Sequence, residues 1–219
     1  MKVYILTRFS IYDPATRSFQ MARGEQDKYK SILFDPKRLD YKLKSFEKIT
    51  LPSVVNQTNK NYKWYIFASS YLPEQYKKRL CQLTKKYSRI QCKFIPSFKE
   101  FNQWKPEPNV SSYCTIRLDD DDGLHTSFFQ QLQKYKKYNK CIVSFPMGKR
   151  VSIQNGNIKY GSVYKARNIA IGLCAIGMNI YHCGEHTKVH QKYKVFYNNT
   201  PRMYLINCSP YCDTKRGFR

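Results

Sequence analysis

The first half of the chain alternates apolar runs with segments of helical periodicity. Apolar and aromatic residues predict buried strands over 1–8, 62–68, 90–95 and 112–118. Between them, residues 36–56 and a segment that begins at Pro73 repeat apolar side chains every three or four positions, and both segments open with a proline. This order of elements predicts a parallel sheet with helices on both faces.

The second half has a different character. A tight hairpin turn is indicated at Asn155-Gly156, between apolar runs over 150–153 and 157–160. Two more strands are predicted, over 141–145 and 169–177. A helix is expected to end near Tyr138. The second half therefore predicts antiparallel pairing beside the first sheet.

The composition limits the function classes. With 219 residues, of which 42% are hydrophobic, the chain is long enough for one sizeable core, so we expect a single domain. A formal charge of +24 and a pI near 9.7 imply an anionic partner. Nucleic acid, an acidic membrane surface and a phosphorylated substrate all satisfy that condition, and the charge does not choose among them.

Neither export nor membrane insertion is indicated. The N-terminal apolar run is too short for a signal peptide, and no stretch approaches the roughly 18 uncharged apolar residues of a membrane span. Eight scattered cysteines without a Cys-x-x-Cys pair suit reduced thiols. We expect a cytoplasmic protein whose membrane contact is peripheral at most.

Four consecutive aspartates, Asp119 to Asp122, follow a predicted strand. Their mutual repulsion in so basic a chain suggests a bound divalent cation, and all-oxygen ligands favour Mg²⁺ or Mn²⁺. The alternative is a solvated acidic turn in which Asp122 caps the next helix. A calcium-binding EF-hand loop is excluded, because Gly123 at its sixth position would place Leu118 and Phe129 at ligand positions.

Polar residues also follow two other predicted strands, as Thr7-Arg8 and Ser69-Ser70. In open α/β sheets, ligands bind beyond the carboxyl ends of the strands. We therefore expect these residues to share one ligand site with the aspartate run.

Three stretches together resemble the GT-A glycosyltransferases. Residues 50–58, which lead into 61–67, look like the helix and second strand of family 2-like members. Ile116–Asp122, with Leu124, looks like their metal-binding DxD segment. With the early Thr7-Arg8-Phe9-Ser10, the combination is similar to the rhamnosyltransferase family. The resemblance covers about the first 125 residues and is diffuse beyond them.

The resemblance implies an α/β GT-A fold in one domain over residues 1–219. A Rossmann-like nucleotide-sugar half would extend to about residue 125, and an acceptor half with a smaller β-hairpin region would cover about 126–219, around a mixed central sheet. The implied activity is transfer of a sugar, with rhamnose as the candidate, from a nucleotide diphosphate sugar to a hydroxyl of a glycan or lipid-linked acceptor, with inversion. Mn²⁺ or Mg²⁺ would neutralise the leaving group as a Lewis acid.

The resemblance also assigns candidate site residues. The donor-binding set is Thr7, Arg8, Ser69, Arg117 and Asp119. The metal set is Asp119, Asp121 and Asp122, joined by a late histidine for which His186 is the candidate. Ser69 and Ser70 stand where family 2-like enzymes commonly place an aspartate against the nucleobase, so the specificity for the base stays open.

An inverting transferase also needs a base to accept the proton of the acceptor hydroxyl. After the aspartate run the chain offers Glu185 and Asp213 as its carboxylates. Asp213 belongs to a basic tail, so Glu185 is the expected catalytic base.

Three late histidines are spaced by four residues, at His182, His186 and His190. On a helix they would share one face. Such a stripe suits zinc, although a surface or structural role is the commoner explanation of this pattern.

Two other function classes compete with the glycosyltransferase interpretation. A nucleic-acid-binding module would account for the charge and for aromatic residues interleaved with lysines, but it gains nothing from four aspartates in its groove. A nucleotidyltransferase would share the fold and the metal carboxylates. It usually carries a glycine-rich phosphate loop after the first strand, whereas residues 7–13 contain no glycine.

Overall fold

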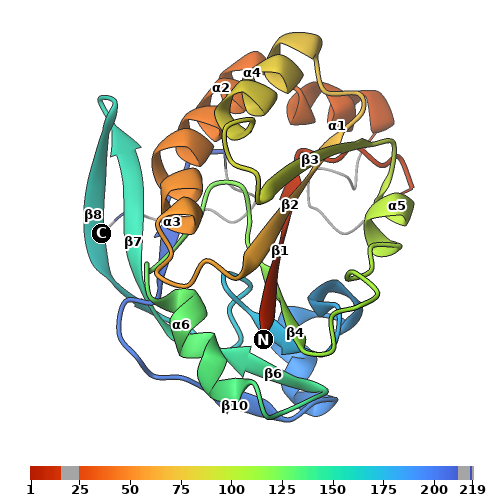
Figure 1. Ribbon diagram of the computed structural model, residues 1–219. Coiled ribbons are helices and arrows are strands. Elements are labelled where there is room, and N and C mark those ends of the chain that lie inside the picture. The colour runs from red at the N-terminus through yellow and green to blue at the C-terminus, as the bar shows by residue number, and fades with distance from the viewer. Residues whose placement is uncertain (16–24, 212–217, 219) are drawn as a thin grey trace.

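The chain folds around a seven-stranded mixed sheet (Figure 1). The computed structural model describes residues 1–15, 25–211 and 218. The strands of this sheet are β1 (Lys2–Phe9), β2 (Tyr62–Ser69), β3 (Ile90–Ile95), β4 (Tyr113–Arg117), β6 (Cys141–Ser144), β9 (Cys174–Ile176) and β10 (Val195–Tyr197). Their order is β10-β6-β9-β4-β1-β2-β3, and β9 runs antiparallel to both of its neighbours while the remaining pairs are parallel. The four strands predicted in the first half are confirmed.

Helices cover both faces of this sheet, as the alternation of elements predicts. They are α1 (Gln26–Leu33), α2 (Pro36–Ser45), η2 (Phe46–Thr50), α3 (Leu51–Val55), α4 (Glu74–Thr84), α5 (Phe98–Asn102), α6 (Phe128–Leu132), η3 (Gln133–Tyr135), η4 (Ile180–His182) and η5 (His186–Gln191). α2, η2 and α3 follow one another without a break, and η2 is a π-helical turn. Elements α2, α3, α4 and α6 pack on one face, and α5, η4 and η5 pack on the other.

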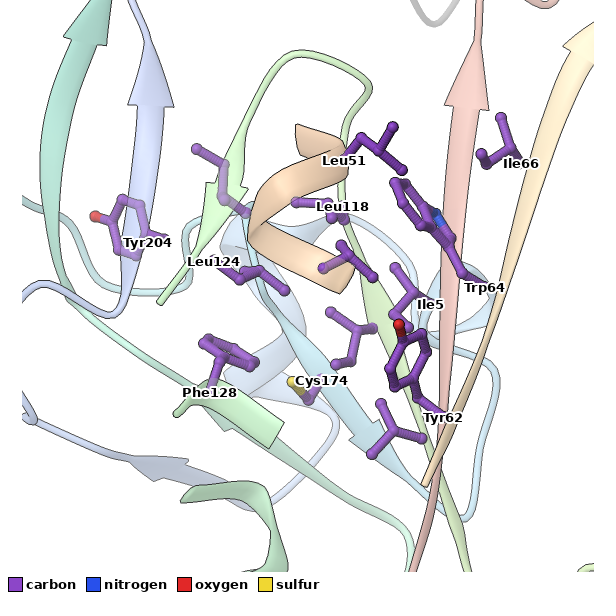
Figure 2. Packing of buried hydrophobic residues seen from close by; sticks show 14 of the residues in the cluster. Ile5, Leu51, Tyr62, Trp64, Ile66, Leu118, Leu124, Phe128, Cys174 and Tyr204 are labelled. Atoms are coloured by element: carbon purple, nitrogen blue, oxygen red, sulfur yellow. The ribbon is translucent and has the colours of Figure 1, made fainter. Parts of the chain in front are cut away.

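The strands divide their side chains between two cores because successive residues of a strand point to opposite faces. On β1, Val3 and Ile5 join the large cluster under the α2–α3 helix, whereas Tyr4 and Leu6 join the aromatic cluster under α5. Figure 2 shows part of the large cluster, in which Trp64 lies fully buried beside the helix. That cluster draws residues from both halves of the chain. The division into one domain with two functional halves remains a prediction.

A second sheet of four strands lies beside the first. Its strands are β5 (Gly123–Leu124), β7 (Met147–Gln154), β8 (Asn157–Lys165) and β11 (Tyr204–Asn207), in the order β5-β11-β7-β8. The predicted hairpin is β7–β8, and both turn residues have positive φ, 49° at Asn155 and 79° at Gly156, as such a two-residue turn requires. Lys48 of η2 donates a hydrogen bond of 2.7 Å to the Gly156 carbonyl, which ties the hairpin tip to the long helix formed by α2, η2 and α3. Figure 1 shows the hairpin beside this helix.

Two predictions for the second half are wrong in extent. The strand expected over 169–177 is reduced to β9, because Gly172 and Gly177 adopt φ values of +67° and +68°, which turn the backbone out of an extended path. The helix expected to reach Tyr138 is reduced to the short elements α6 and η3.

Six cysteines within the described ranges are free thiols: Cys81, Cys92, Cys114, Cys141, Cys174 and Cys183. Across those same ranges, none of the helices has both the length and the apolar character needed to traverse a bilayer.

Candidate active site at the carboxyl ends of β1 and β4

Arg8 and Arg117 converge on Asp119. Parallel pairing sets Leu6 of β1 opposite Arg117 of β4, so the two arginines leave the same edge of the sheet. Arg8 Nη2 lies 3.7 Å from Asp119 Oδ1, and Arg117 Nη2 lies 3.7 Å from Asp119 Oδ2. Burial, the largest single effect, lowers the pKa of Arg117, but Asp119, Tyr181 and Asp122 together outweigh it, so that the pKa is raised. Both guanidinium groups therefore stay charged beside a carboxylate that is one-third exposed.

A tyrosine lies against both arginines. The Cζ atoms of Arg8 and Arg117 lie 5.0 and 5.5 Å from the centroid of the Tyr181 ring, within range of a cation–π contact. The sequence offers no local signal for this role, since Tyr181 is one of 19 tyrosines and follows Arg117 by 64 positions.

Asp120 serves the fold. Its side chain is 2% exposed and forms an ion pair with Lys42 of α2, and its carbonyl accepts a hydrogen bond of 3.0 Å from the Thr50 hydroxyl of η2. Burial raises the pKa of Asp120 to about 6, while Lys42 acts to lower that pKa. The long helix thus holds the aspartate run in place from one side.

Asp122 also has a structural role. Its Oδ1 accepts a hydrogen bond of 2.8 Å from the backbone amide of Asn207 in β11, and Asn207 Nδ2 donates to Ser45 Oγ at 3.2 Å. The expectation that Asp122 caps the next helix is wrong, because the residue before α6 is Ser127. This buried hydrogen bond links Asp122 to the second sheet, and its role as a metal ligand stays a prediction.

Asp119 and Asp121 are, with Asp122, the carboxylates predicted to hold a metal. Within the described ranges, no three His, Cys, Asp or Glu side chains are grouped so that they could hold a metal ion. The role of His186 as a further ligand stays a prediction. Mg²⁺ commonly binds proteins through one or two carboxylates, with substrate phosphates and water completing its six ligands. Two alternate aspartates at this edge of the sheet therefore fit Mg²⁺ or Mn²⁺.

Two predicted donor-binding residues have their side chains inside the protein. The Thr7 hydroxyl is fully buried and accepts a hydrogen bond of 2.9 Å from Trp64 Nε1. The Ser69 hydroxyl, also fully buried, accepts from the Tyr71 amide at 3.2 Å. Any contact of Thr7 or Ser69 with a nucleotide-sugar donor would therefore come from their backbone atoms. Tyr71 itself is half exposed at the end of β2.

The three late histidines do not share a helix face, so that expectation is wrong. His182 ends η4, whereas His186 and His190 lie in the separate helix η5. Gly184, which lies between the two helices, has a φ of +88°. His182 Nε2 lies 2.7 Å from the Asn102 carbonyl, and His190 Nδ1 lies 3.1 Å from Asn168 Nδ2. His182 therefore contacts the end of α5, whereas His190 contacts the segment between β8 and β9.

Glu185 is exposed at the start of η5. Its carboxylate pairs with Lys188 at 2.8 Å and accepts a hydrogen bond of 2.9 Å from the Thr187 hydroxyl. Lys188 is the main reason that the pKa of Glu185 is lowered. Glu185 lies four positions after Tyr181, on the segment that reaches the arginine pair. The competing carboxylate, Asp213, lies outside the described residues.

Sequence comparison assigns the family. Residues 2–216 match the model of the family described as "Putative rhamnosyl transferase". The chain belongs to this family. No curated protein sequence matches the chain.

The fold of this rhamnosyl transferase family member is shared with solved glycosyltransferases. Residues 1–349 of S. aureus TarS superpose with a TM-score of 0.53 at 7% identity, over 94% of this chain and 60% of TarS 1–349. The TarS complex with UDP-GlcNAc gives a TM-score of 0.51 at 8% identity, over 94% of this chain and 58% of that one. The GT-A fold expected from the sequence is confirmed. The chain spans about 60% of the TarS fragment.

Gln57, in the stretch that resembles family 2-like glycosyltransferases, has a structural role in this chain. Gln57 is fully buried, and its Nε2 donates to the carbonyls of Ser53 at 2.8 Å and His125 at 2.7 Å. Its Oε1 accepts from the Phe129 amide at 3.0 Å. These bonds fasten the end of α3 to the start of α6, just after the aspartate run.

Proposed function

We propose that the chain transfers a sugar from a nucleotide diphosphate sugar to a hydroxyl of a glycan or lipid-linked acceptor, with inversion. Rhamnose is the candidate sugar because the family description names it. The observation that supports the reaction class is the cluster of Arg8 and Arg117 around Asp119 at the carboxyl ends of β1 and β4. The UDP-GlcNAc complex of TarS supports a nucleotide sugar as the donor.

The arginines suit a diphosphate leaving group. Breaking the bond between the sugar and the phosphate places negative charge on the diphosphate, and this charge must be neutralised for the bond to break. Planar guanidinium groups donate paired hydrogen bonds to phosphate oxygens and stay charged at every physiological pH. Arg8 and Arg117 would therefore hold the diphosphate and stabilise it as it departs.

Asp119 and Asp121 would hold Mg²⁺ or Mn²⁺ beside these arginines. When bound, such an ion supplies Lewis-acid stabilisation of the leaving diphosphate. Asp120 and Asp122 keep the two ligands in place through their bonds to Lys42 and the Asn207 amide.

The nucleobase would lie at the end of β2. Tyr71 is 51% exposed there, and its ring contacts the Tyr12 ring at 5.7 Å and the Lys30 ammonium at 5.4 Å. An exposed aromatic ring stacks on any base. Tyr71 can therefore supply affinity for the nucleobase even though Ser69 and Ser70 replace the aspartate that commonly contacts it in family 2-like enzymes.

Glu185 is the proposed base for the acceptor hydroxyl. Its carboxylate is ionised and can accept a proton, although the pairing with Lys188 lowers its pKa and makes it a weaker base than an unpaired glutamate. The segment around it would then face the acceptor, in keeping with the proposed acceptor half of the chain.

A lipid-linked acceptor would bring the chain to a membrane surface. The formal charge of +24 favours peripheral contact with anionic headgroups. Sedimentation with vesicles of phosphatidylglycerol, compared with vesicles of phosphatidylcholine, tests this contact directly.

The proposed function is tested with a panel of UDP-, dTDP- and GDP-linked sugars, with and without Mn²⁺. A donor should raise the melting temperature, because it binds only the folded chain, and the shift should need Mn²⁺. The Mn²⁺-dependent shift of the melting temperature should be absent in Asp119→Asn and in Asp121→Asn, whereas Asp27→Asn on α1 should keep this shift. Incubation with an acceptor should release nucleoside diphosphate. Release of pyrophosphate from a nucleoside triphosphate and a sugar phosphate would instead identify a nucleotidyltransferase.

A further inference from the structure

We propose that Tyr181 is a positioning residue that presents Arg8 and Arg117 to the donor diphosphate. This inference rests on the proposed function, because it assigns a task at the same site. Both guanidinium groups contact one ring, with Cζ atoms 5.0 and 5.5 Å from its centroid. Two like charges that share a small volume repel each other, so their common position needs a partner that attracts both.

The ring itself is fixed to the strands that carry the arginines. The Tyr181 hydroxyl donates a hydrogen bond of 3.3 Å to the Leu6 carbonyl, two residues before Arg8 on β1. The neighbouring Ile180 amide donates to Thr115 Oγ1 at 2.8 Å, two residues before Arg117 on β4. The position of the Tyr181 ring is therefore fixed by β1 and β4, the two strands that carry the arginines.

Two further contacts fix the direction of the ring. The Asn179 side chain accepts from the Tyr181 amide at 3.0 Å and caps η4. The Phe101 ring of α5 packs edge-on against Tyr181, with 4.6 Å between ring centroids. Rotation of the tyrosine ring away from the arginines would break the contact with Phe101 or the bond to Leu6.

The electrostatic character of the ring suits this task. Burial raises the pKa of Tyr181, even though Arg8 and Arg117 act to lower it, so the phenol stays neutral and keeps its hydrogen for Leu6. A neutral ring attracts guanidinium through its face without cancelling the positive charge. Asp119, in contrast, competes with a phosphate for the same arginines. A diphosphate can therefore replace Asp119 as the arginine partner while Tyr181 keeps both groups in place.

The test is calorimetric titration of UDP and dTDP, in excess Mg²⁺, into the wild type and three Tyr181 variants. Tyr181→Leu should weaken binding about tenfold, because the arginines lose their common support while the volume is largely kept. Tyr181→Met is the second apolar replacement, in case the leucine variant does not fold. Tyr181→Phe retains the ring and should lose about threefold or less. Tyr113→Leu is the matched control, because it removes a half-buried tyrosine from the opposite end of β4.

A double-mutant cycle separates positioning from general destabilisation. If the ring acts through the two arginines, combining Tyr181→Leu with Arg8→Lys/Arg117→Lys should cost little more affinity than Arg8→Lys/Arg117→Lys alone. Losses that simply add, or a folded Tyr181→Leu or Tyr181→Met chain with wild-type affinity, would overturn the positioning role. A wild type that binds neither nucleotide would overturn both this inference and the proposed donor class, so the two failures are distinguishable.

Discussion

Lys42 and Asp120, 78 positions apart in the chain, form an ion pair between the long helix and the aspartate run. Both side chains are largely removed from water, with exposed fractions of 13% and 2%. Loss of one partner from such a pair leaves a charge without solvent or counterion. The pair therefore links the stability of the fold to the geometry of the proposed site.

Replacing one partner of this pair should be costly. Lys42→Met should lower the free energy of unfolding by about 3–5 kcal/mol, because Asp120 is left buried without its cation. The double variant Lys42→Met/Asp120→Asn should recover part of that loss, since it removes both charges. Urea unfolding of the two variants and the wild type gives the comparison. If the single and double variants were equally unstable, the pairing would not be the cause.

Tyr71 should contribute to binding of the nucleoside and not of the diphosphate. Base stacking on an aromatic ring is worth about 1–3 kcal/mol, so Tyr71→Ala should weaken UDP binding at least about fivefold. Inorganic pyrophosphate should bind the variant as it binds the wild type. Tyr160→Ala removes a tyrosine of similar exposure, 58%, from β8 and is the control. Equal losses for UDP and pyrophosphate would move the nucleobase away from Tyr71.

The pH dependence of stability should show the ion pair of Glu107 with Lys63. Lys63, assisted by the Tyr4 hydroxyl 3.1 Å from Glu107 Oε2, holds the pKa of Glu107 below its ordinary value. A carboxyl with a lowered pKa contributes stability above its unfolded pKa, and this stability is lost as the pH falls through the folded value. Glu107→Gln should therefore remove part of the acid-side loss of the melting temperature below about pH 5.

Tyr4 should control the alkaline side of the same profile. Burial is the main cause that raises the pKa of Tyr4 to about 12. A raised pKa means that the stabilisation is complete below the unfolded pKa of tyrosine, about 10, and is lost as the pH rises from there through the folded value. Tyr4→Phe should flatten this alkaline loss, while Glu107→Gln should largely keep it. Melting curves from about pH 3 to 11 compare both variants, and identical alkaline profiles in Tyr4→Phe and the wild type would refute the assignment.

Glu185 should affect turnover and not donor binding. Glu185→Gln should leave the affinity for the donor nearly unchanged and lower turnover by about 10² or more, the usual effect of losing a positioned base. Lys188→Gln is the informative companion, because it removes the cation that lowers the pKa of Glu185 and should shift the acid limb of the rate profile to higher pH. A fully active Glu185→Gln enzyme would transfer the role to another carboxylate, with Asp213 the first to examine.

Local chemistry made parts of the fold predictable. The β7–β8 turn follows from Asn155 and Gly156, because these residue types tolerate the positive φ that the turn demands. The strand expected over 169–177 failed for a related reason: two of its glycines, Gly172 and Gly177, adopt positive φ, and an apolar run alone does not show this. The histidine stripe failed because Gly184 ends one helical turn before the next begins.

The site was less predictable because its partners are distant in the chain. Four adjacent aspartates indicate an oxygen-rich segment. Only the packed structure shows that Asp120 forms an ion pair with Lys42 and that Asp122 accepts a hydrogen bond from the Asn207 amide. The arginines were identifiable from their strand ends. Tyr181 was not identifiable from the sequence, since its role depends on hydrogen bonds that join η4 to β1 and to β4.

The central claim is that Arg8 and Arg117 bind a nucleoside diphosphate beside Asp119, and titration of UDP and dTDP into the double variant Arg8→Gln/Arg117→Gln tests it most directly. Loss of two charged phosphate donors should weaken binding by about 10² or more, since hydrogen bonds to charged groups contribute roughly 1.5–3 kcal/mol each. Arg79→Gln removes an exposed, ion-paired arginine from α4 and should bind like the wild type. A correctly folded Arg8→Gln/Arg117→Gln chain with undiminished affinity for both nucleotides would contradict the account.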